Sequence, residues 1–283
     1  MKAHKQWNSR QTEQALAENV VARVFIGYER PLDPQVRDHA NIERAEEALG
    51  AEGMEELNQV LLGTAIKFGF AQPERLSSDT TVQELPIGYP NEPGILRGLA
   101  QRCQRALVKM KKYATLGAEA VERGIEHTQE VLKSVKHHHL FAKQQEEKGR
   151  VLAHIVAQTE ALIRQSAEVV AKVGRCPIGG VQKALGVLQT MGEVAAVLLP
   201  QIWQWLQTGV VAKGKIIHAG ITEARAIVKG KAGKKVEFGL KWLVNRITGG
   251  YLFGQRVEAY ADERQMPVVA LERSLAPRPH RRW

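Results

Sequence analysis

The spacing of the apolar residues changes twice along this chain, and this change most limits the folds that it can adopt. Between Gly94 and about Leu206 the apolar residues recur every three or four positions, in three stripes typical of long helices. On either side, shorter segments alternate apolar and polar residues, as half-buried strands do. A single strand is not stable alone, so the strand before the helical stretch must pair with strands that follow it. The helices would then be an insertion into a sheet.

Each of the three helical stripes is narrow and must be buried against another helix, so a helical hairpin or a small antiparallel bundle is expected. Pro200 should kink or break the third helix, because proline removes a backbone donor and clashes with the preceding turn. The stripes are Leu96, Leu99, Cys103, Ala106, Met110 and Tyr113; Leu152, Ile155, Thr159, Leu162, Ser166, Val169 and Val173; and Val181, Leu185, Leu188, Ala195, Leu199, Ile202 and Leu206.

The remaining elements follow from the same patterns. The segment KIIHAGITEARAIVKGK predicts one strand, and KKVEFGLKWLVNRITGGYLFGQRVEAY predicts two strands joined by a hairpin at Gly249 and Gly250. Helical spacing from about Gln11 to Phe70 predicts N-terminal helices, interrupted at Gly50 and Gly53. One face of these helices would carry Leu57, Val60, Leu61 and Ile66.

We therefore expect an α+β protein with four parts. These are a helical N-terminal domain over 1–72, a first strand and turn over 73–93, a helical insertion over 94–213, and the remaining strands with a basic tail over 214–283.

Charge and composition limit the classes of partner and compartment. The formal net charge of +10 over 283 residues favours polyanionic partners, chiefly nucleic acid. The N-terminus lacks the apolar core of a secretory signal, and the most apolar run, Val194–Leu206, is too short to span a bilayer. Cys103 and Cys176 form no CxxC pair, which indicates reduced thiols. The sequence predicts a soluble cytoplasmic protein with no membrane partner.

The segment SSDTTVQELPIGYP places one acid, Asp79, inside a run of β-forming residues, although aspartate is depleted in strands. One interpretation is a strand end at which Asp79 begins a turn. The other is a metal-binding carboxylate, which a strand fixes more firmly than a loop would.

Three segments carry a resemblance to a known family. DTTVQELPIGYPNEPGILRGL resembles the segment around the first catalytic aspartate of the DDE transposases of bacterial insertion sequences. VKGKAGKKVEFGLKW, followed by GGYLFG, looks like the Lys-Gly-Lys and Glu-Phe-Gly strand pair of these enzymes. ARVFIGYERPLDPQVRDHANIERAEEALGAEGMEEL is similar to their helical N-terminal domain, with Phe25-Ile26-Gly27 and Arg37-Asp38-His39 at its characteristic places.

The resemblance implies a ribonuclease H-like fold in which three carboxylates hold two Mg²⁺ or Mn²⁺ ions. These ions activate a water or a DNA 3′-hydroxyl for in-line displacement at phosphorus. It implies that Asp79 is catalytic and the first metal ligand, whereas Glu84 has no metal role. The partners would be the terminal inverted repeats of a transposon and a target DNA, and the enzyme would be a homo-oligomer.

The chain departs from this family after the hairpin. The second aspartate, in an Asp-Arg-Gly setting, and the glutamate on a later helix have no counterpart before Trp283, and Asp262 lies in the loop just after the hairpin. The basic tail APRPHRRW has the composition of a frameshifted or truncated end. One aspartate cannot organise a two-metal site, so we expect a sheet that is incomplete and a chain that is inactive alone. The alternative is a non-enzymatic DNA-binding or helical interaction protein, a transposase remnant.

Several other clusters have a functional and a structural interpretation. The basic loop between two predicted strands either contacts DNA phosphates or is a solvated turn. The run His137–His139 suggests a solvated turn between helices rather than a metal site, because adjacent helical residues do not share a face. Trp203 and Trp205 favour core packing at the end of a bundle over base stacking. The candidate DNA-binding residues of the basic loop are Arg225, Lys229, Lys231, Lys234 and Lys235.

Overall fold

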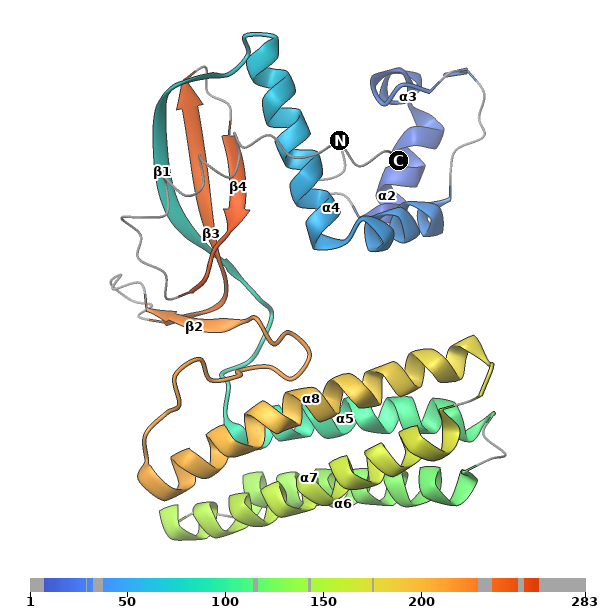
Figure 1. The fold of residues 1–283 in the computed structure, drawn as a ribbon, viewed down its shortest axis with the longest axis vertical. Helices are drawn as coiled ribbons and strands as arrows, with labels where there is room; N and C mark the ends of the chain where they lie inside the picture. The colour runs from blue at the N-terminus through green and yellow to red at the C-terminus, as the bar shows by residue number, and fades with distance from the viewer. Residues whose placement is uncertain are drawn as a thin grey trace. The chain divides into compact units, whose positions relative to one another are not determined.

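The computed structural model describes residues 8–28, 30–32, 38–113, 117–141, 144–174, 176–228, 236–248 and 252–259. These residues form two compact units. The first contains the N-terminal helices, the chain as far as Asp79, and Leu243–Gln255, whereas the second contains Thr80–Trp242 and the segment from Arg256 to Ala259. The fold is α+β, with helices predominating and one four-stranded antiparallel sheet. This confirms the expected class, and Figure 1 shows the elements of each unit.

Three helices lie in the first unit: α2 (Ser9–Glu18), α3 (Val20–Phe25) and α4 (His39–Lys67). Each begins at a polar residue whose side-chain oxygen accepts a bond from a backbone N–H, as N-cap residues do: Asn8, Asn19 and Asp38. Gly50 interrupts α4 as predicted, with φ 59° and ψ −169°, which is a backbone conformation that favours glycine.

The buried face of α4 differs from the predicted one. Leu62 and Ala65 are buried and pack with Ile247, whereas Leu57, Val60 and Leu61 are exposed. The prediction was based on the largest apolar side chains. The face that packs against the sheet is instead the one that carries the small Ala65, because a small side chain lets the helix come close to the strands. Of the predicted face only Ile66 contributes to this small core.

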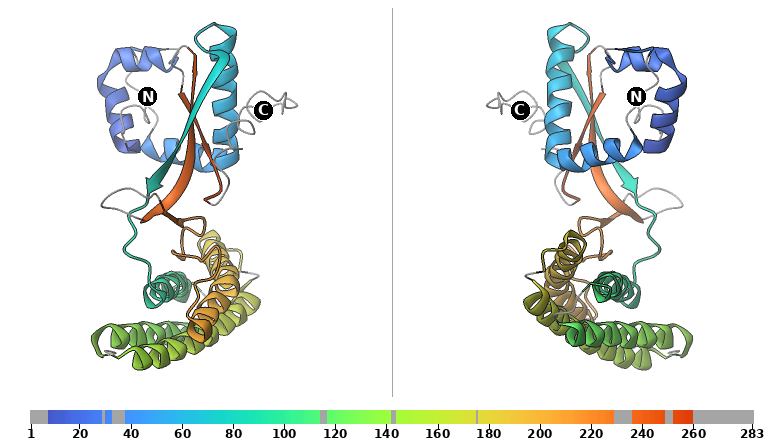
Figure 2. Two further views of the ribbon diagram at one scale, coloured as in Figure 1. Left: turned by 90° about the vertical axis from the view of Figure 1, so that its left-hand side faces the viewer. Right: turned by 90° about the vertical axis from the view of Figure 1, so that its right-hand side faces the viewer.

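The sheet is built on two long strands, β1 (Gln72–Glu84) and β3 (Val236–Thr248), which lie side by side in Figures 1 and 2. The strand β2 (Arg225–Val228) pairs antiparallel with the start of β3, with Arg225 opposite Gly239, and β4 (Leu252–Arg256) also pairs with β3. The pairing of the strand that carries Asp79 with the later strands confirms the prediction. The predicted hairpin glycines, Gly249 and Gly250, lie outside the described residues.

Four helices between β1 and β2 form the core of the second unit. They are α5 (Glu92–Lys111), α6 (Ala118–Phe141), α7 (Gln145–Val173) and α8 (Gly179–Thr208). The helix α5 packs mainly against α6 and α8, and α7 packs against the same two helices, so the four form a bundle. The long helical insertion into the sheet is therefore confirmed.

The predicted stripes on α5, α7 and α8 form the bundle core. All seven residues of the α7 stripe are buried, including Thr159, whose hydroxyl donates to the carbonyl of Ile155 at 2.8 Å. Of the first predicted stripe, Tyr113 lies two residues beyond the end of α5 and is exposed. The fourth stripe, on α6, was missed because small and polar residues dilute its apolar spacing: Ala120, Val121, Thr128, Val131 and Val135.

Pro200 does not break the third predicted helix, because α8 continues through Pro200 to Thr208. The other predicted outcome, a kink at Pro200, stays a prediction. The burial of Leu198, Leu199 and Ile202 on either side of this turn holds the helix together, which offsets the lost backbone bond. The helix α8 is long and apolar enough to cross a membrane, although 44% of its most apolar window is buried against the rest of the chain.

The two cysteines differ in exposure, and we expect them to differ in reactivity. Cys103 is fully buried in the bundle core, and this burial raises its pKa to about 12, whereas Cys176 is half-buried after α7. Because the thiolate is the nucleophile, Cys103 should react with iodoacetamide at pH 8 at least about 100-fold more slowly than Cys176. Mass spectrometry of the alkylated peptides checks this, and in urea the two rates should converge. Equal rates in the native protein would contradict the burial of Cys103.

Candidate functional site

Asp79 lies near the middle of β1, and its side chain is exposed. The direction of this side chain follows from its neighbour: Ser78 Oγ donates to Asn245 Oδ1 on β3 at 2.6 Å, so Ser78 and Asn245 share one face of the sheet. Asn245 and Ile247 on that face are buried. Because successive strand residues alternate, Asp79 lies on the opposite, more open face.

Within the first unit, the open face of the sheet carries few groups that could complete a metal site. Asp79 shares it with Arg75 and Ser77 from β1 and with Val244 and Arg246 from β3, by the alternation of the strands. Of the residues described on this face, Asp79 is the one carboxylate. This donor set provides one ligand, and it does not fit a two-metal site, so no cutting step can be derived from these residues alone.

Arg225, the first residue of β2, lies at a basic cavity of about 500 Å³ in the second unit. Its guanidinium donates to the carbonyl oxygens of Thr222 and Ala224, the latter at 2.8 Å, so part of its hydrogen-bonding capacity fixes its own loop. The cavity is also lined by residues that sequence spacing could not connect, because they come from three separate segments: Lys213, Glu223, Lys241, Arg256 and Glu258.

This cavity contains cations and carboxylates together. Arg256 Nη2 lies 4.0 Å from Glu223 Oε1, and both side chains are largely exposed. The other four members of the predicted basic loop, Lys229, Lys231, Lys234 and Lys235, lie outside the described residues, as does Asp262. The predicted DNA-binding role of the loop therefore stays a prediction.

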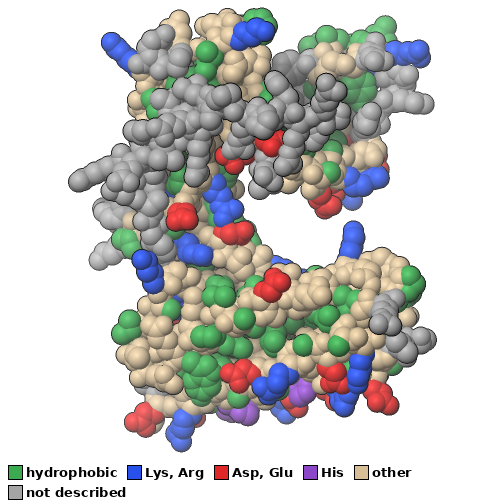
Figure 3. All heavy atoms as spheres, viewed as in Figure 1, with side chains coloured by type: hydrophobic (Ala, Val, Ile, Leu, Met, Phe, Trp, Pro, Cys, Tyr) green, Lys and Arg blue, Asp and Glu red, His purple; other side chains and the backbone are tan. Residues whose placement is uncertain are grey.

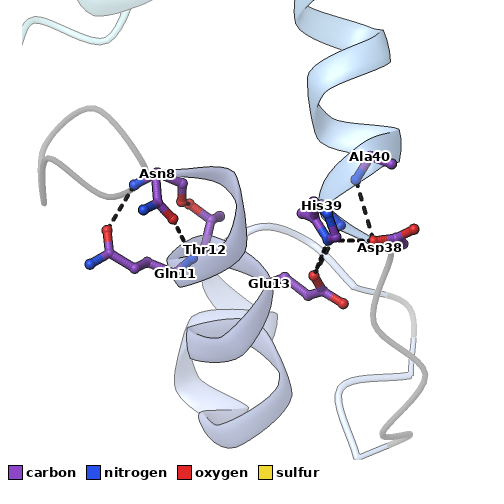
Figure 4. A network of polar contacts seen from close by, with 7 residues as sticks. All are labelled: Asn8, Gln11, Thr12, Glu13, Asp38, His39 and Ala40. Atoms are coloured by element: carbon purple, nitrogen blue, oxygen red, sulfur yellow. Dashed lines mark hydrogen bonds and ion pairs between the residues drawn. The ribbon is translucent and has the colours of Figure 1, made fainter.

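A polar network joins α2 to the start of α4 (Figure 4). Glu13 Oε2 accepts from the backbone N–H of His39 at 3.1 Å and lies 2.8 Å from its Nδ1, while Asp38 Oδ1 lies 2.6 Å from the same Nδ1. Asp38 also caps α4 by accepting from the N–H of Ala40. Glu13, Asp38 and His39 form the one group of metal-type ligands that converges within the described ranges. Hydrogen bonds between these three groups and helix capping account for this arrangement.

The histidine run has a different environment from the predicted one. His137, His138 and His139 lie in the last turns of α6 and not in a turn between helices. Burial lowers the pKa of His138, and the nearby His139 and Lys148 lower it further, so the neutral imidazole is favoured. These histidines belong to no converging ligand group among the described residues.

The tryptophan pair occupies the predicted place. Trp203 and Trp205 are partly buried and pack against the bundle core, and Trp203 Nε1 donates to Glu160 Oε1 at 3.1 Å. A partly buried aromatic ring whose N–H donates to a neighbouring helix favours the structural interpretation.

Comparison of the chain with protein-family models, with curated proteins and with solved structures gave no match. The function is therefore inferred from the residues and their geometry.

Proposed function

We propose that this chain is a transposase of the DDE class, in which Asp79 supplies the first of the carboxylates that hold Mg²⁺ or Mn²⁺. The observation that carries the proposal is the position of Asp79: an exposed carboxylate on the open face of a long strand that pairs with the strand of the Glu-Phe-Gly motif. A strand paired in this way holds a ligand in a fixed position. The enzyme would cut and join the ends of a transposon in the cytoplasm, as a ribonuclease H-like homo-oligomer.

The lone carboxylate favours a second candidate function. One ligand on the open face does not organise two metal ions, and a chain with DNA-binding surfaces but no complete site would be a non-enzymatic DNA-binding protein. Under the first proposal, the missing carboxylates come from residues outside the described ranges or from sequence encoded further downstream. Under the second proposal, Asp79 has no catalytic partner.

Reading the coding DNA beyond codon 283 in all three frames separates these candidates. A strand with Asp-Arg-Gly, followed by a helix with a glutamate, would supply the missing ligands. The chain joined to that segment should then nick DNA that carries the element's ends in Mg²⁺ or Mn²⁺. No such segment in any frame would overturn the enzyme and leave the DNA-binding protein.

The joined protein allows a direct test of Asp79. Asp79→Asn removes one charge from the metal site and should lower cleavage at least about 1,000-fold while leaving DNA binding unchanged. Glu84→Gln is the matched control, because Glu84 is an exposed carboxylate on the same strand whose side chain alternates to the other face. Cleavage by Asp79→Asn at the wild-type rate would contradict the assigned role.

A further inference from the structure

The outward face of α5 is basic along its whole length. Arg97, Arg105 and Lys109 of α5, and Lys112 at its C-cap, recur at spacings of eight, four and three residues. Because the backbone at Lys112 is still helical, the four fall on one side of the helix, and all four are exposed. Gln101 lies between the two arginines on the same side, half-exposed. We call Arg97, Gln101, Arg105, Lys109 and Lys112 the α5 basic face. It spans about 22 Å at 1.5 Å per residue.

No carboxylate of α5 balances this charge. The only acidic residue of the helix is Glu92 in its first turn, and Glu92 pairs with Lys215, with both side chains mostly buried. Among the residues that the structure describes, the four cations of the α5 basic face form no ion pair, whereas Lys111, at the edge of the face, pairs with Glu122 at 2.8 Å. A row of cations without counterions attracts a polyanion strongly.

The surface beside these cations is hollowed at both ends of the helix. A cavity of about 380 Å³ at the N-terminal end is lined by Tyr89, Gly94, Arg97, Gly98 and Gln101. Gly98 has no atom within 4 Å of the position that a Cβ would take, so the backbone is open to a ligand there.

A second cavity, of about 440 Å³, lies at the C-terminal end of the helix and is lined by Arg105, Lys109, Lys112 and Tyr113. Tyr89 and Tyr113 are 83% and 50% exposed, which places an accessible aromatic ring beside the cations at each end of α5.

The other helices of the bundle lack such a surface. The helix α7 exposes Lys148, Arg150 and Arg164, but it also carries Glu146 and Glu168, and Glu168 lies within 3.0 Å of both Arg123 and Lys172. Figure 3 shows Lys and Arg side chains beside Asp and Glu side chains along the lower edge of the bundle, where α6 and α7 lie. The absence of acids on the α5 basic face is therefore a property of that helix and not of the bundle as a whole.

We propose that the α5 basic face binds the phosphate backbone of duplex DNA. The distance of about 22 Å over which its cations are spread corresponds to roughly six base-pair steps of 3.4 Å, so each cation can meet a separate phosphate. The uncharged Gln101 between them is a side chain that hydrogen-bonds phosphate, sugar or base edges. This inference deepens the proposed function by adding a DNA-binding surface, but it does not depend on Asp79.

Fluorescence anisotropy with a labelled 20-base-pair duplex tests the proposal on the full chain. The variant R97Q/R105Q/K112Q removes three cations from exposed positions, so its fold should persist. At about 0.1 M KCl its affinity should fall at least about 30-fold, and the slope of log K against log salt concentration should decrease by about 2 to 3. Circular dichroism and size-exclusion chromatography verify that the variant is folded.

The matched control is K148Q/R150Q/R164Q, which removes the same charge from three exposed positions spread around α7. It should bind the duplex within about threefold of wild type, because only the long-range attraction changes. An equal loss of affinity in both triple variants would show that only the net charge matters, and it would overturn the proposal. Failure of the wild-type chain to bind the duplex at low salt would overturn it as well.

A measurement on the wild-type chain adds an independent check. Bound duplex should protect Lys109 and Lys112 from acetylation relative to Lys148, as read by mass spectrometry. Equal protection of all three lysines would contradict the α5 basic face. The Asp79→Asn variant should bind the duplex like wild type. A wrong transposase proposal would therefore show in the cleavage assay alone, and a wrong proposal for the α5 basic face would show in the binding assay alone.

Discussion

Replacing Gly239 with alanine is expected to lower the free energy of unfolding by about 3 kcal/mol, because the backbone of β1 leaves no room for a Cβ at this position of β3. A Cβ added at Gly239 would lie 2.1 Å from the carbonyl oxygen of Gln83 and 2.9 Å from its carbon. These are backbone atoms, so no side-chain rotation can relieve the clash. The strands must separate, and the neighbouring bond from the N–H of Leu85 to the carbonyl of Phe238 would be lost.

The measurement is urea unfolding combined with hydrogen exchange of the β1 and β3 amides. Gly192→Ala is the matched control, since Gly192 lies inside α8 with no atom within 4 Å of its added Cβ. It should raise the stability by roughly 0.5–1 kcal/mol, because alanine is the better helix former. A Gly239→Ala variant that unfolds at the wild-type urea concentration would show that the close approach of the two strands is wrong.

The second large effect is expected in the bundle core, where Leu107 of α5 meets Gly124 of α6. Leu107 is fully buried, and both of its methyl carbons would lie 3.1 Å from a Cβ added at Gly124. Leu107→Ala should lower the free energy of unfolding by about 2–5 kcal/mol through lost burial and the cavity that remains. Gly124→Ala alone should gain little, because the improved helix propensity is offset by crowding against Leu107.

A double-mutant cycle tests this contact directly. In the Leu107→Ala background the crowding is gone, so Gly124→Ala should recover about 1 kcal/mol or more. Thermal and urea unfolding of the wild type, the two single variants and the double variant provide the four values. Strict additivity of the two substitutions would show that Leu107 and Gly124 do not touch.

The sequence predicted the bundle better than it predicted the N-terminal unit. The α7 stripe is correct at every position because regular apolar spacing in a long helix leaves one buried face. On α4 the large apolar residues stand on more than one side, so spacing alone did not select Leu62 and Ala65. Pro200 illustrates a local preference overridden by packing, since the surrounding core holds α8 helical.

The sequence likewise predicted one part of the candidate site and not another. The sequence placed Asp79 on a strand and predicted its pairing with later strands, because alternation and the instability of a lone strand are local and topological arguments. The sequence did not indicate that Asp79 is the one carboxylate among the residues described on its face. The side chains that share this face are set by the register between the strands, and the pattern of a single strand does not contain that information. The α5 basic face could have been predicted from the sequence, because its cations recur at helical spacing. The prediction for this helix used only the apolar stripe that forms its buried side.

The position of the bundle within the chain also affects how the sheet can form. About 150 residues separate the end of β1 from the start of β3, and pairing such distant segments is slow when the intervening chain is unordered. The bundle depends on contacts closer in sequence, and it brings its own two ends together, because Glu92 in the first turn of α5 pairs with Lys215, which follows α8. If the helices form first, the loop to be closed shrinks to about 30 residues, and its entropic cost falls by about 1.5 kcal/mol. The inserted bundle would then hold the adjoining ends of the chain close together. The pairing of β1 with β3 would form as fast as a pairing between segments that are near in sequence.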